Sequence, residues 1–238
     1  QSEAGELRPL SRWIGRLCRL LGRTCLLLCF PFLPPSDEED DDEQFSPETL
    51  ERVRVHTGFF QTYASVRGEV TALLGERLAR CREEGRLPRV YVTGHSLGGA
   101  VANCCALDIA SPAVKNEDLL GREPLVPSPL VYTFGSPRLG NAAFRSVYNV
   151  LVPWTFRIVA SRDVVPTLPP SISYRQLGRE VWLDDVGETT FVMSWAMRHI
   201  LPARSNALNH PLVSYYRHLA KAFRRGGSGG GGGGGLET

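Results

Sequence analysis

The sequence lacks a long apolar run, has almost no lysine and carries little net charge. A membrane-spanning helix needs about 20 mostly apolar residues, and no stretch of these 238 residues approaches that length. Lysine occurs only at positions 115 and 221, and the formal net charge is +2. The charge is polarised instead, basic before residue 25 and acidic from 37 to 43. The chain as a whole is therefore not built to bind nucleic acid.

The cysteines show no C-x-x-C pair, and no histidine cluster accompanies them. They are Cys18, Cys25, Cys29, Cys81, Cys104 and Cys105. This spacing matches neither a metal site nor the disulfide framework of a small secreted domain. It favours a reducing, intracellular compartment, cytoplasmic or plastid. We expect Cys104 and Cys105 to be small buried thiols in a helix.

Length and composition divide the chain into three parts. The whole chain suits one α/β domain with a sizeable core, which we place at residues 51–223. Residues 1–50 hold a basic segment, an apolar run at 25–33 and an acidic stretch that is typical of a solvated loop. Residues 224–238 form a Gly-rich tail outside the fold. The chain shows no internal repeats.

The basic segment has the pattern of an amphipathic helix over residues 9–23. The arginines are Arg8, Arg12, Arg16, Arg19 and Arg23, and the apolar side holds Leu10, Trp13, Ile14, Leu17, Leu20 and Leu21. This pattern predicts peripheral contact with a membrane or lipid surface. Two alternatives stay open, a helix docked on the domain and an organelle-targeting segment. The apolar run that follows is too short to span a bilayer and could add a strand to a sheet.

The most informative motif is G-H-S-L-G at residues 94–98. A strand-like run at 89–93 precedes it, and a helix-like run of small and apolar residues at 97–108 follows. Between a strand and a helix, this motif is the nucleophile elbow of the α/β-hydrolase fold, in which a sharp turn exposes the serine Oγ. We expect Ser96 to be the nucleophile, with His95 supporting the turn and pointing away from the Oγ. The alternative is a Gly-rich surface turn.

The glycines and the helix start have expected roles in this elbow. Gly94 and Gly98 should let the strand and helix backbones approach without Cβ clashes. The backbone N–H of Leu97, at the helix N-terminus, is the expected oxyanion-hole donor.

A serine nucleophile of this fold needs an acid and then a histidine, in that chain order. Asp163 directly follows a strand-like run at 156–160, at the sheet edge where ligands collect in open α/β sheets. Asp184 and Asp185 are weaker candidates, because they only end a short strand-like stretch.

Five histidines compete for the role of base. The order rule removes His56 and His95, and we expect His56 to be a hydrogen-bonded packing residue. His210 lies in a loop just before a helix-like run at 212–223, and catalytic residues favour loops on a rigid scaffold. His199 and His218 fall in or near helices, where partly exposed structural roles are expected. His210 is therefore the preferred base.

Several blocks together resemble the class 3 (fungal-type) lipases and their plant and algal relatives. Residues 94–100 (GHSLGGA), followed by ALD at 106–108, look like the family's nucleophile block. Further similar blocks are VHTGF at 55–59, YTFGSPRLGN at 132–141, RIVASRDVVP at 157–166, GREVW at 178–182 and NHPLVSY at 209–215. They follow the family's order across residues 53 to 217.

The resemblance implies an α/β-hydrolase fold, a central, mostly parallel sheet flanked by helices, and hydrolysis of lipid esters. It assigns Ser96, Asp163 and His210 as the triad. It also implies a lid and no metal or organic cofactor. The sequence departs from the family in one place, because residues 1–52 contain no F-R-G-[ST] motif, whose turn supplies the first oxyanion-hole donor. The source of that donor is unknown.

The predicted function is therefore a serine carboxylic-ester hydrolase acting on lipids, of the triacylglycerol lipase or phospholipase A1/galactolipase type. The missing turn supports an alternative, a catalytically weak or inactive lipase-like domain that binds lipid or membrane surfaces. A soluble short-chain esterase is the third reading.

Overall fold

The computed structural model describes residues 47–111, 128–186, 189–190 and 209–228. The predicted basic helix at 9–23, the apolar run at 25–33, the acidic stretch and His199 lie outside these residues.

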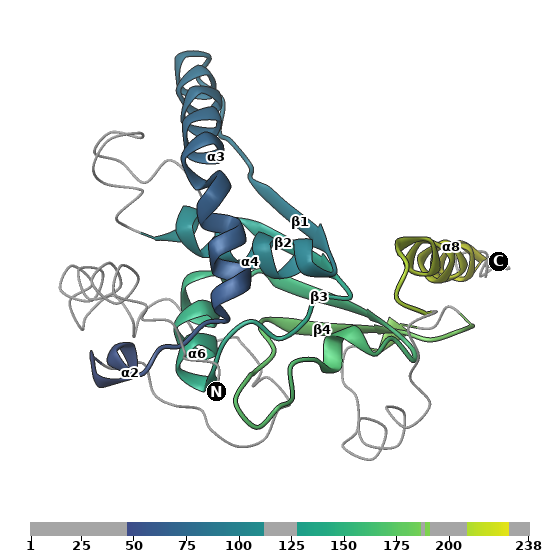
Figure 1. The fold of residues 1–238 in the computed structure, drawn as a ribbon. Coiled ribbons are helices and arrows are strands. Elements are labelled where there is room, and N and C mark those ends of the chain that lie inside the picture. The colour runs from purple at the N-terminus through teal and green to yellow at the C-terminus, as the bar shows by residue number, and fades with distance from the viewer. Residues whose placement is uncertain (1–46, 112–127, 187–188, 191–208, 229–238) are drawn as a thin grey trace, which may run out of the picture.

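A five-stranded sheet in the order β1-β2-β3-β4-β5 organises the described part of the chain (Figure 1). The strands are β1 (Tyr91–His95), β2 (Leu130–Phe134), β3 (Thr155–Ala160), β4 (Arg179–Leu183) and β5 (Thr189–Thr190). Strands β1 to β4 pair in parallel, and β5 pairs antiparallel with β4. The carboxyl ends of β1 to β4 consequently meet at one edge of the sheet.

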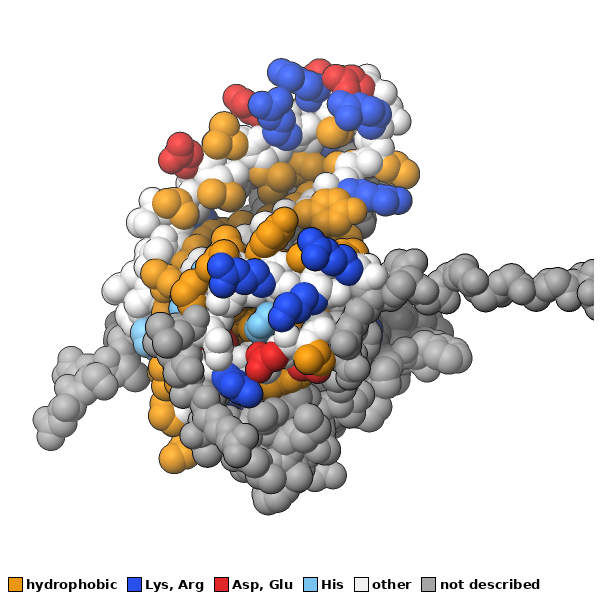
Figure 2. Space-filling view, turned by 90° about the vertical axis from the view of Figure 1, so that its right-hand side faces the viewer, with side chains coloured by type: hydrophobic (Ala, Val, Ile, Leu, Met, Phe, Trp, Pro, Cys, Tyr) orange, Lys and Arg blue, Asp and Glu red, His pale blue; other side chains and the backbone are white. Residues whose placement is uncertain are grey.

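Helices pack on both faces of the sheet, as the alternation of side chains along the strands requires. The helices are α2 (Pro47–Glu51), α3 (Thr57–Glu83), α4 (Leu97–Ala110), α6 (Ala142–Leu151) and α8 (Leu212–Ser228), with a 3₁₀ turn at Val165–Thr167. The main core cluster joins Val131 of β2 to α4 and α6. A second cluster joins Ile158 of β3 and Leu183 of β4 to Tyr215 of α8. Figure 2 shows the side of the molecule that faces right in Figure 1, where α8 lies.

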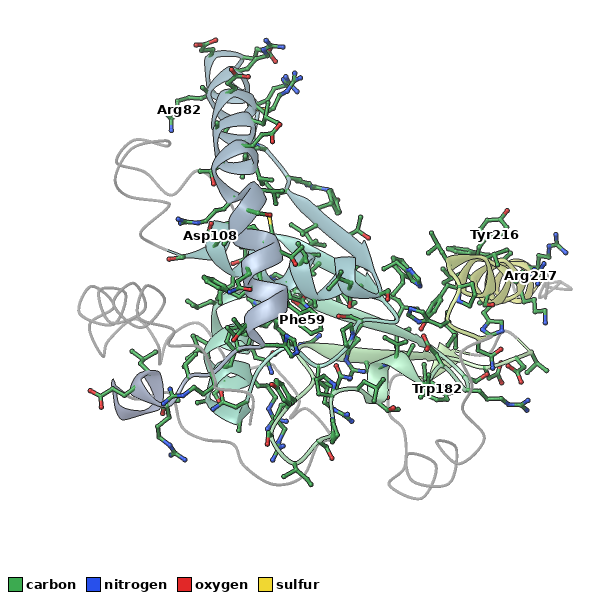
Figure 3. The ribbon with its side chains drawn as sticks, in the orientation of Figure 1. Phe59, Arg82, Asp108, Trp182, Tyr216 and Arg217 are labelled. Atoms are coloured by element: carbon green, nitrogen blue, oxygen red, sulfur yellow. The ribbon has the colours of Figure 1, made fainter. Side chains whose placement is uncertain are left out.

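A buried carboxylate fixes the packing of α3 on α4. Asp108 of α4 accepts hydrogen bonds from the Tyr63 hydroxyl (2.6 Å) and from Arg67 Nε (2.6 Å), both on α3. Figure 3 shows Asp108 where these two helices meet. Burying a charge is costly unless it is paired and hydrogen-bonded, so this contact specifies one arrangement of the two helices. It thereby fixes α4, the helix that begins one residue after Ser96.

Most predicted elements are found, with shifted ends. Strand β3 begins one residue earlier than the predicted run at 156–160, whereas β1 begins two residues later than expected and runs up to His95. Helix α4 continues past residue 108 to Ala110. Helix α2 crosses the boundary predicted between the N-terminal part and the domain, at residues 50 and 51. Helix α8 crosses the boundary predicted between the domain and the Gly-rich tail, at residues 223 and 224. Among the described helices, none is long and apolar enough to cross a membrane.

Candidate active site

The turn between β1 and α4 is sharp and strained. Ser96 has φ 57° and ψ −129°, a backbone conformation that residues other than glycine rarely adopt. Such strain costs about 1–3 kcal/mol and persists only where the surroundings enforce it. Here the Ser96 N–H donates to the Phe134 carbonyl (2.9 Å), and the Gly99 N–H donates to the Ser96 carbonyl (2.9 Å). Both bonds hold the turn in place.

The close approach at this turn depends on Gly94 and Gly99, which corrects the expectation for Gly98. A Cβ on Gly94 would lie 2.1 Å from the Gly98 carbonyl oxygen. One on Gly99 would lie 2.7 Å from Cβ of Ser136, the residue that follows Gly135 after β2. A Cβ on Gly98 would meet nothing within 4 Å, because that position faces open space. The Gly98 carbonyl takes part in the crowded contact, but a side chain at position 98 would itself fit without a clash.

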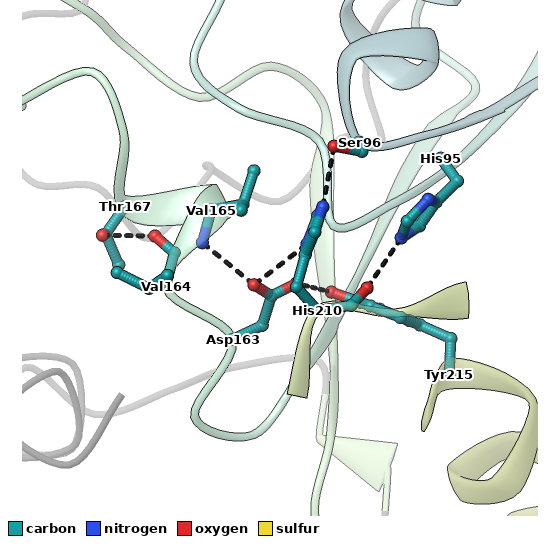
Figure 4. A network of polar contacts seen from close by, with 8 residues as sticks. All are labelled: His95, Ser96, Asp163, Val164, Val165, Thr167, His210 and Tyr215. Carbon is teal, nitrogen blue, oxygen red and sulfur yellow. Dashed lines mark hydrogen bonds and ion pairs between the residues drawn. The ribbon is translucent and has the colours of Figure 1, made fainter. Parts of the chain in front are cut away.

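Three side chains from distant parts of the chain form a hydrogen-bonded series (Figure 4). His210 Nε2 lies 2.7 Å from Ser96 Oγ. The other ring nitrogen, Nδ1, lies 3.0 Å from Asp163 Oδ2 and 3.2 Å from Oδ1. The histidine thus bridges the serine and the carboxylate, which matches the geometry required for a nucleophile, a base and the group that orients the base.

Asp163 is buried, and each of its oxygens has a second donor besides His210. The Val165 N–H donates to Oδ1 (2.9 Å), and the Tyr215 hydroxyl donates to Oδ2 (2.5 Å). The Tyr215 side chain is itself buried, and burial together with the Asp163 charge raises its pKa. It therefore stays a hydrogen-bond donor at every physiological pH. These bonds fix the orientation of the carboxylate toward the His210 ring.

Tyr215 lies in the 209–215 block, but no role for it is predictable from the sequence. Its spacing five residues after His210 is the only sequence signal, and that signal says nothing about Asp163. Gly135 makes the contact possible. It has φ 59°, and a Cβ there would lie 2.8 Å from both Asp163 Oδ2 and the Tyr215 hydroxyl. Any other residue at this position would displace the pair.

His95 contacts the loop that carries His210, a contact beyond the support of the turn that the sequence predicts. Its Nε2 lies 2.8 Å from the His210 carbonyl oxygen, so this nitrogen carries the proton and donates it. The two imidazole rings stack with centroids 4.7 Å apart, and the ring of Tyr215 meets His95 edge-on at 5.8 Å. The residue before Ser96 therefore holds the loop of His210 in place.

The loop after Asp163 is tied to the loop after β2. The Arg138 N–H donates to the Leu168 carbonyl (2.7 Å), and Arg138 Nη1 donates to the Pro169 carbonyl (2.8 Å). Within this loop Pro166 is buried, whereas the Leu168 side chain is about half exposed. These two hydrogen bonds anchor the backbone that follows Asp163 to the loop after β2.

The competing carboxylates lie elsewhere. Asp185 accepts a hydrogen bond from Ser161 Oγ (2.5 Å) and pairs with Arg162 Nη2 (3.3 Å). Asp184 accepts the Val186 N–H (2.9 Å). Neither contacts His210, so geometry favours Asp163 as the acid.

The competing histidines have other surroundings. His218 is buried in α8, rather than partly exposed as expected, and its Nε2 lies 3.8 Å from Asp185 Oδ1. Desolvation lowers its pKa, so it stays neutral near pH 7. His56 stacks on Phe59 (4.2 Å between centroids), and its backbone N–H donates to the Leu139 carbonyl (2.8 Å). Within the described residues its buried Nδ1 has no hydrogen-bond partner. Neither histidine contacts the serine.

One backbone N–H beside Ser96 is positioned to donate a hydrogen bond to an oxyanion. Leu97 is the first residue of α4, so its N–H has no acceptor within the helix. A negative oxygen next to Ser96 would also meet the positive end of the helix dipole. Within the described ranges, no three His, Cys, Asp or Glu side chains group closely enough to hold a metal ion.

The cysteines of α4 do not compete as nucleophiles. Burial raises the pKa of the Cys104 thiol to about 12 and that of the partly buried Cys105 thiol to about 11. Because the thiolate is the reactive form, both thiols are inert near neutral pH.

Comparison with known proteins places this architecture in a family. The family described as lipase (class 3) matches residues 35–173, more than half of the chain. The lipase of Rhizomucor miehei is 37% identical over 134 residues, which cover 56% of this chain and 33% of that protein. A secreted mono- and diacylglycerol lipase of Fusarium solani is 34% identical over 131 residues, 55% of this chain and 34% of that protein.

Solved structures of lipases are similar to this chain as well. The native complex of Rhizomucor miehei lipase with its propeptide superposes with a TM-score of 0.53 at 27% identity, covering 76% of this chain and 54% of that one. A triacylglycerol lipase whose catalytic centre is described as a serine protease triad has a TM-score of 0.52 at 31% identity, covering 75% and 62%.

The fold is therefore that of the α/β-hydrolases, as predicted from the elbow and from the family resemblance. The chain belongs to the class 3 lipase family. It spans about a third of the length of these two sequence relatives and less than two thirds of the two solved structures.

Proposed function

We propose that this chain hydrolyses carboxylic esters of lipids through Ser96, His210 and Asp163. The observation that carries the proposal is the continuous series of short contacts from Ser96 Oγ through the His210 ring to Asp163. Family membership supports the lipid-ester substrate class.

In the first half-reaction, Ser96 Oγ attacks the ester carbonyl carbon while His210 Nε2 accepts its proton. Asp163 keeps the His210 proton on Nδ1 and stabilises the imidazolium that forms. The carbonyl oxygen becomes an oxyanion and accepts the Leu97 N–H. When the tetrahedral intermediate collapses, Nε2 returns the proton to the leaving alcohol, and an acyl-Ser96 ester remains.

In the second half-reaction, water takes the place of the alcohol. His210 Nε2 removes a proton from the water, whose oxygen attacks the acyl carbon. Collapse releases the fatty acid, and the proton returns to Ser96 Oγ. The two steps consume one water for each ester bond, and every proton passes through the same nitrogen.

Labelling by a fluorophosphonate tests the proposal directly. An activated serine forms a covalent phosphonyl adduct, which mass spectrometry locates in the peptide that holds Ser96. We expect Ser96→Ala to abolish labelling and to lower hydrolysis of a p-nitrophenyl ester by about 10⁴-fold or more, because triad members act as a unit. His210→Ala should match it, whereas His218→Ala should retain labelling. The reverse pattern for the two histidines would reassign the base.

A second candidate function is a catalytically weak lipase-like domain that binds lipid. The absence of an F-R-G-[ST] motif in residues 1–52 favours it, since loss of one oxyanion donor costs about 10²–10³ in rate. Slow but stoichiometric labelling of Ser96, with negligible turnover of esters, would identify this case.

Peripheral contact with lipid surfaces through residues 9–23 is also part of the proposal. The regular arginines of this segment favour anionic lipid, with each basic residue near the surface contributing about 1 kcal/mol. Replacing Arg12, Arg16 and Arg19 with Gln should weaken vesicle binding and flatten its salt dependence. Equal binding by the triple variant and the parent would remove this segment from the proposal.

A further inference from the structure

Helix α8 carries an apolar stripe that the fold does not bury. Tyr215 and Leu219 of this helix pack against the sheet. On another side, Leu212, Tyr216 and Phe223 are 56%, 72% and 80% exposed. Their spacing of four and seven residues places them along one side of the helix. Figure 3 shows Tyr216 projecting away from the strands. The stripe therefore adds nothing to the core and leaves three large side chains in water.

The charges of α8 are all of one sign. Between Leu212 and Ser228 the helix contains Arg217, Lys221, Arg224 and Arg225 and no acidic residue. Three of these basic side chains are exposed: Arg217, Lys221 and Arg224. Of these, Lys221 donates a hydrogen bond from Nζ to the Asp185 carbonyl (2.7 Å). In Figure 2, Lys and Arg side chains gather on the face where α8 lies, with hydrophobic side chains beside them.

The stripe begins at the candidate active site. Leu212 follows His210 by two residues, so its Cα lies within about 8 Å of the His210 Cα, given about 3.8 Å per residue. Leu97, next to Ser96, is also 48% exposed. An apolar surface held by α8 would therefore lie close to the reacting groups.

We propose that α8 docks the protein on an anionic lipid surface, with Leu212, Tyr216 and Phe223 entering the interface and Arg217 and Arg224 contacting lipid phosphates. The proposal deepens the proposed function, because it names the surface that presents the ester to Ser96. An exposed apolar side bordered by Lys and Arg, with aromatic residues among the apolar ones, is the pattern of helices that lie in a membrane interface.

The positive charge of α8 favours an anionic lipid surface over a second copy of the chain as the partner of the apolar stripe. A symmetric dimer through the stripe would place two helices with four basic residues each against one another, and like charges across an interface oppose association. An anionic lipid surface complements these charges and accepts the apolar side chains.

Vesicle binding by the full chain tests the docking. The probe is a vesicle of diether phosphatidylcholine, with or without diether phosphatidylglycerol, since ether lipids cannot be hydrolysed. All variants also carry Ser96→Ala, so catalysis plays no part. We expect Tyr216→Ser with Phe223→Ser to weaken binding by about tenfold or more. Arg217→Gln with Arg224→Gln should weaken binding to the anionic vesicles by about 25-fold at low salt, from about 1 kcal/mol per charge.

Matched substitutions far from α8 provide the controls. Leu87, after α3, is 86% exposed, and Arg77 and Arg80 are exposed on α3. Leu87→Ser, and Arg77→Gln with Arg80→Gln, should leave binding within twofold. The series is repeated with Arg12, Arg16 and Arg19 changed to Gln, so that the N-terminal segment cannot mask the effect. Circular dichroism melting confirms that each variant is folded.

Several outcomes would overturn the docking proposal. Folded α8 variants that bind like the parent in both N-terminal backgrounds would remove α8 from the interface. Equal binding of the parent to neutral and anionic vesicles would contradict the role of the arginines. A dimer that dissociates when Tyr216 and Phe223 are changed, without vesicle binding, would assign the stripe to a second copy. If the parent protein, which retains Ser96, is not labelled by the fluorophosphonate but vesicle binding still depends on α8, only the proposed catalysis is refuted.

Discussion

The two sides of the candidate active site are built in different ways. On the Ser96 side, β1, the turn and α4 are consecutive, and the geometry depends on Gly94, Gly99 and the strained backbone of Ser96. On the other side, Asp163 and His210 come from loops 47 residues apart, and their alignment depends on contacts from Tyr215 and His95. The Ser96 turn therefore depends mainly on neighbouring residues, whereas the alignment of Asp163 with His210 requires support from distant parts of the chain.

This difference has an energetic counterpart. The Ser96 side stores backbone strain, which the hydrogen bonds of Ser96 and Gly99 offset. The Asp163 side instead buries a carboxylate, which is tolerable only because His210, Val165 and Tyr215 satisfy its oxygens. Substitutions should affect the first side through backbone geometry and the second through charge and hydrogen bonding.

The largest expected effect lies on the Asp163 side. Asp163→Asn should fold but lower kcat by about 10⁴-fold, because the amide cannot hold the proton on His210 Nδ1. The measurement is hydrolysis of a soluble p-nitrophenyl ester. Asp184→Asn is the matched control and should change the rate less than twofold. An active Asp163→Asn enzyme beside an inactive Asp184→Asn enzyme would move the acid to the end of β4.

The next effect tests the local side through its glycines. Gly94→Ala places a Cβ 2.1 Å from a backbone oxygen, and we expect it to lower the free energy of unfolding by about 3 kcal/mol or more. Gly98→Ala meets open space within a helix, so it should raise stability by up to about 1 kcal/mol. Urea denaturation measures both. Equal destabilisation by the two alanines would contradict the steric account of the elbow.

A smaller loss of stability is expected from removing one donor to Asp163. Tyr215→Phe keeps the buried ring but loses the bond to Oδ2, and a hydrogen bond to a charged group is worth about 1.5–3 kcal/mol. Chemical denaturation near neutral pH measures the change. The neighbouring Tyr216 is 72% exposed, so Tyr216→Phe should alter stability by less than about 0.5 kcal/mol. Equal changes in the free energy of unfolding for the two variants would show that the Tyr215 hydroxyl does not stabilise Asp163.

The smallest effect separates strain from chemistry at the nucleophile. Ser96→Gly relieves a φ of 57° and should raise the free energy of unfolding by about 1 kcal/mol relative to Ser96→Ala, since glycine adopts this region without a penalty. Both variants should be inactive. A glycine variant that is no more stable than the alanine variant would show that the turn stores no strain.

The sequence alone could predict the local elements for a physical reason. Residues 156–160 are rich in β-branched and aromatic side chains, so a strand was expected there, and β3 begins one residue earlier, at Thr155. The elbow was predicted because a strand, a Gly-flanked serine and a helix follow one another within twenty residues. The bounds of β1 were wrong by two residues, since pairing with β2 extends the strand to His95. Pairing partners, which lie far along the chain, decide such ends.

The strand, turn and helix around Ser96 could be predicted from the sequence alone, because propensity and glycine spacing are properties of neighbouring residues. The mostly parallel sheet was expected only from the resemblance to the class 3 lipases. Three features became visible only in the folded molecule: Gly99 rather than Gly98 is crowded, His95 holds the His210 loop, and Tyr215 anchors Asp163. Each of these contacts joins residues brought together by the packing of helices on the sheet, and no local pattern encodes that packing.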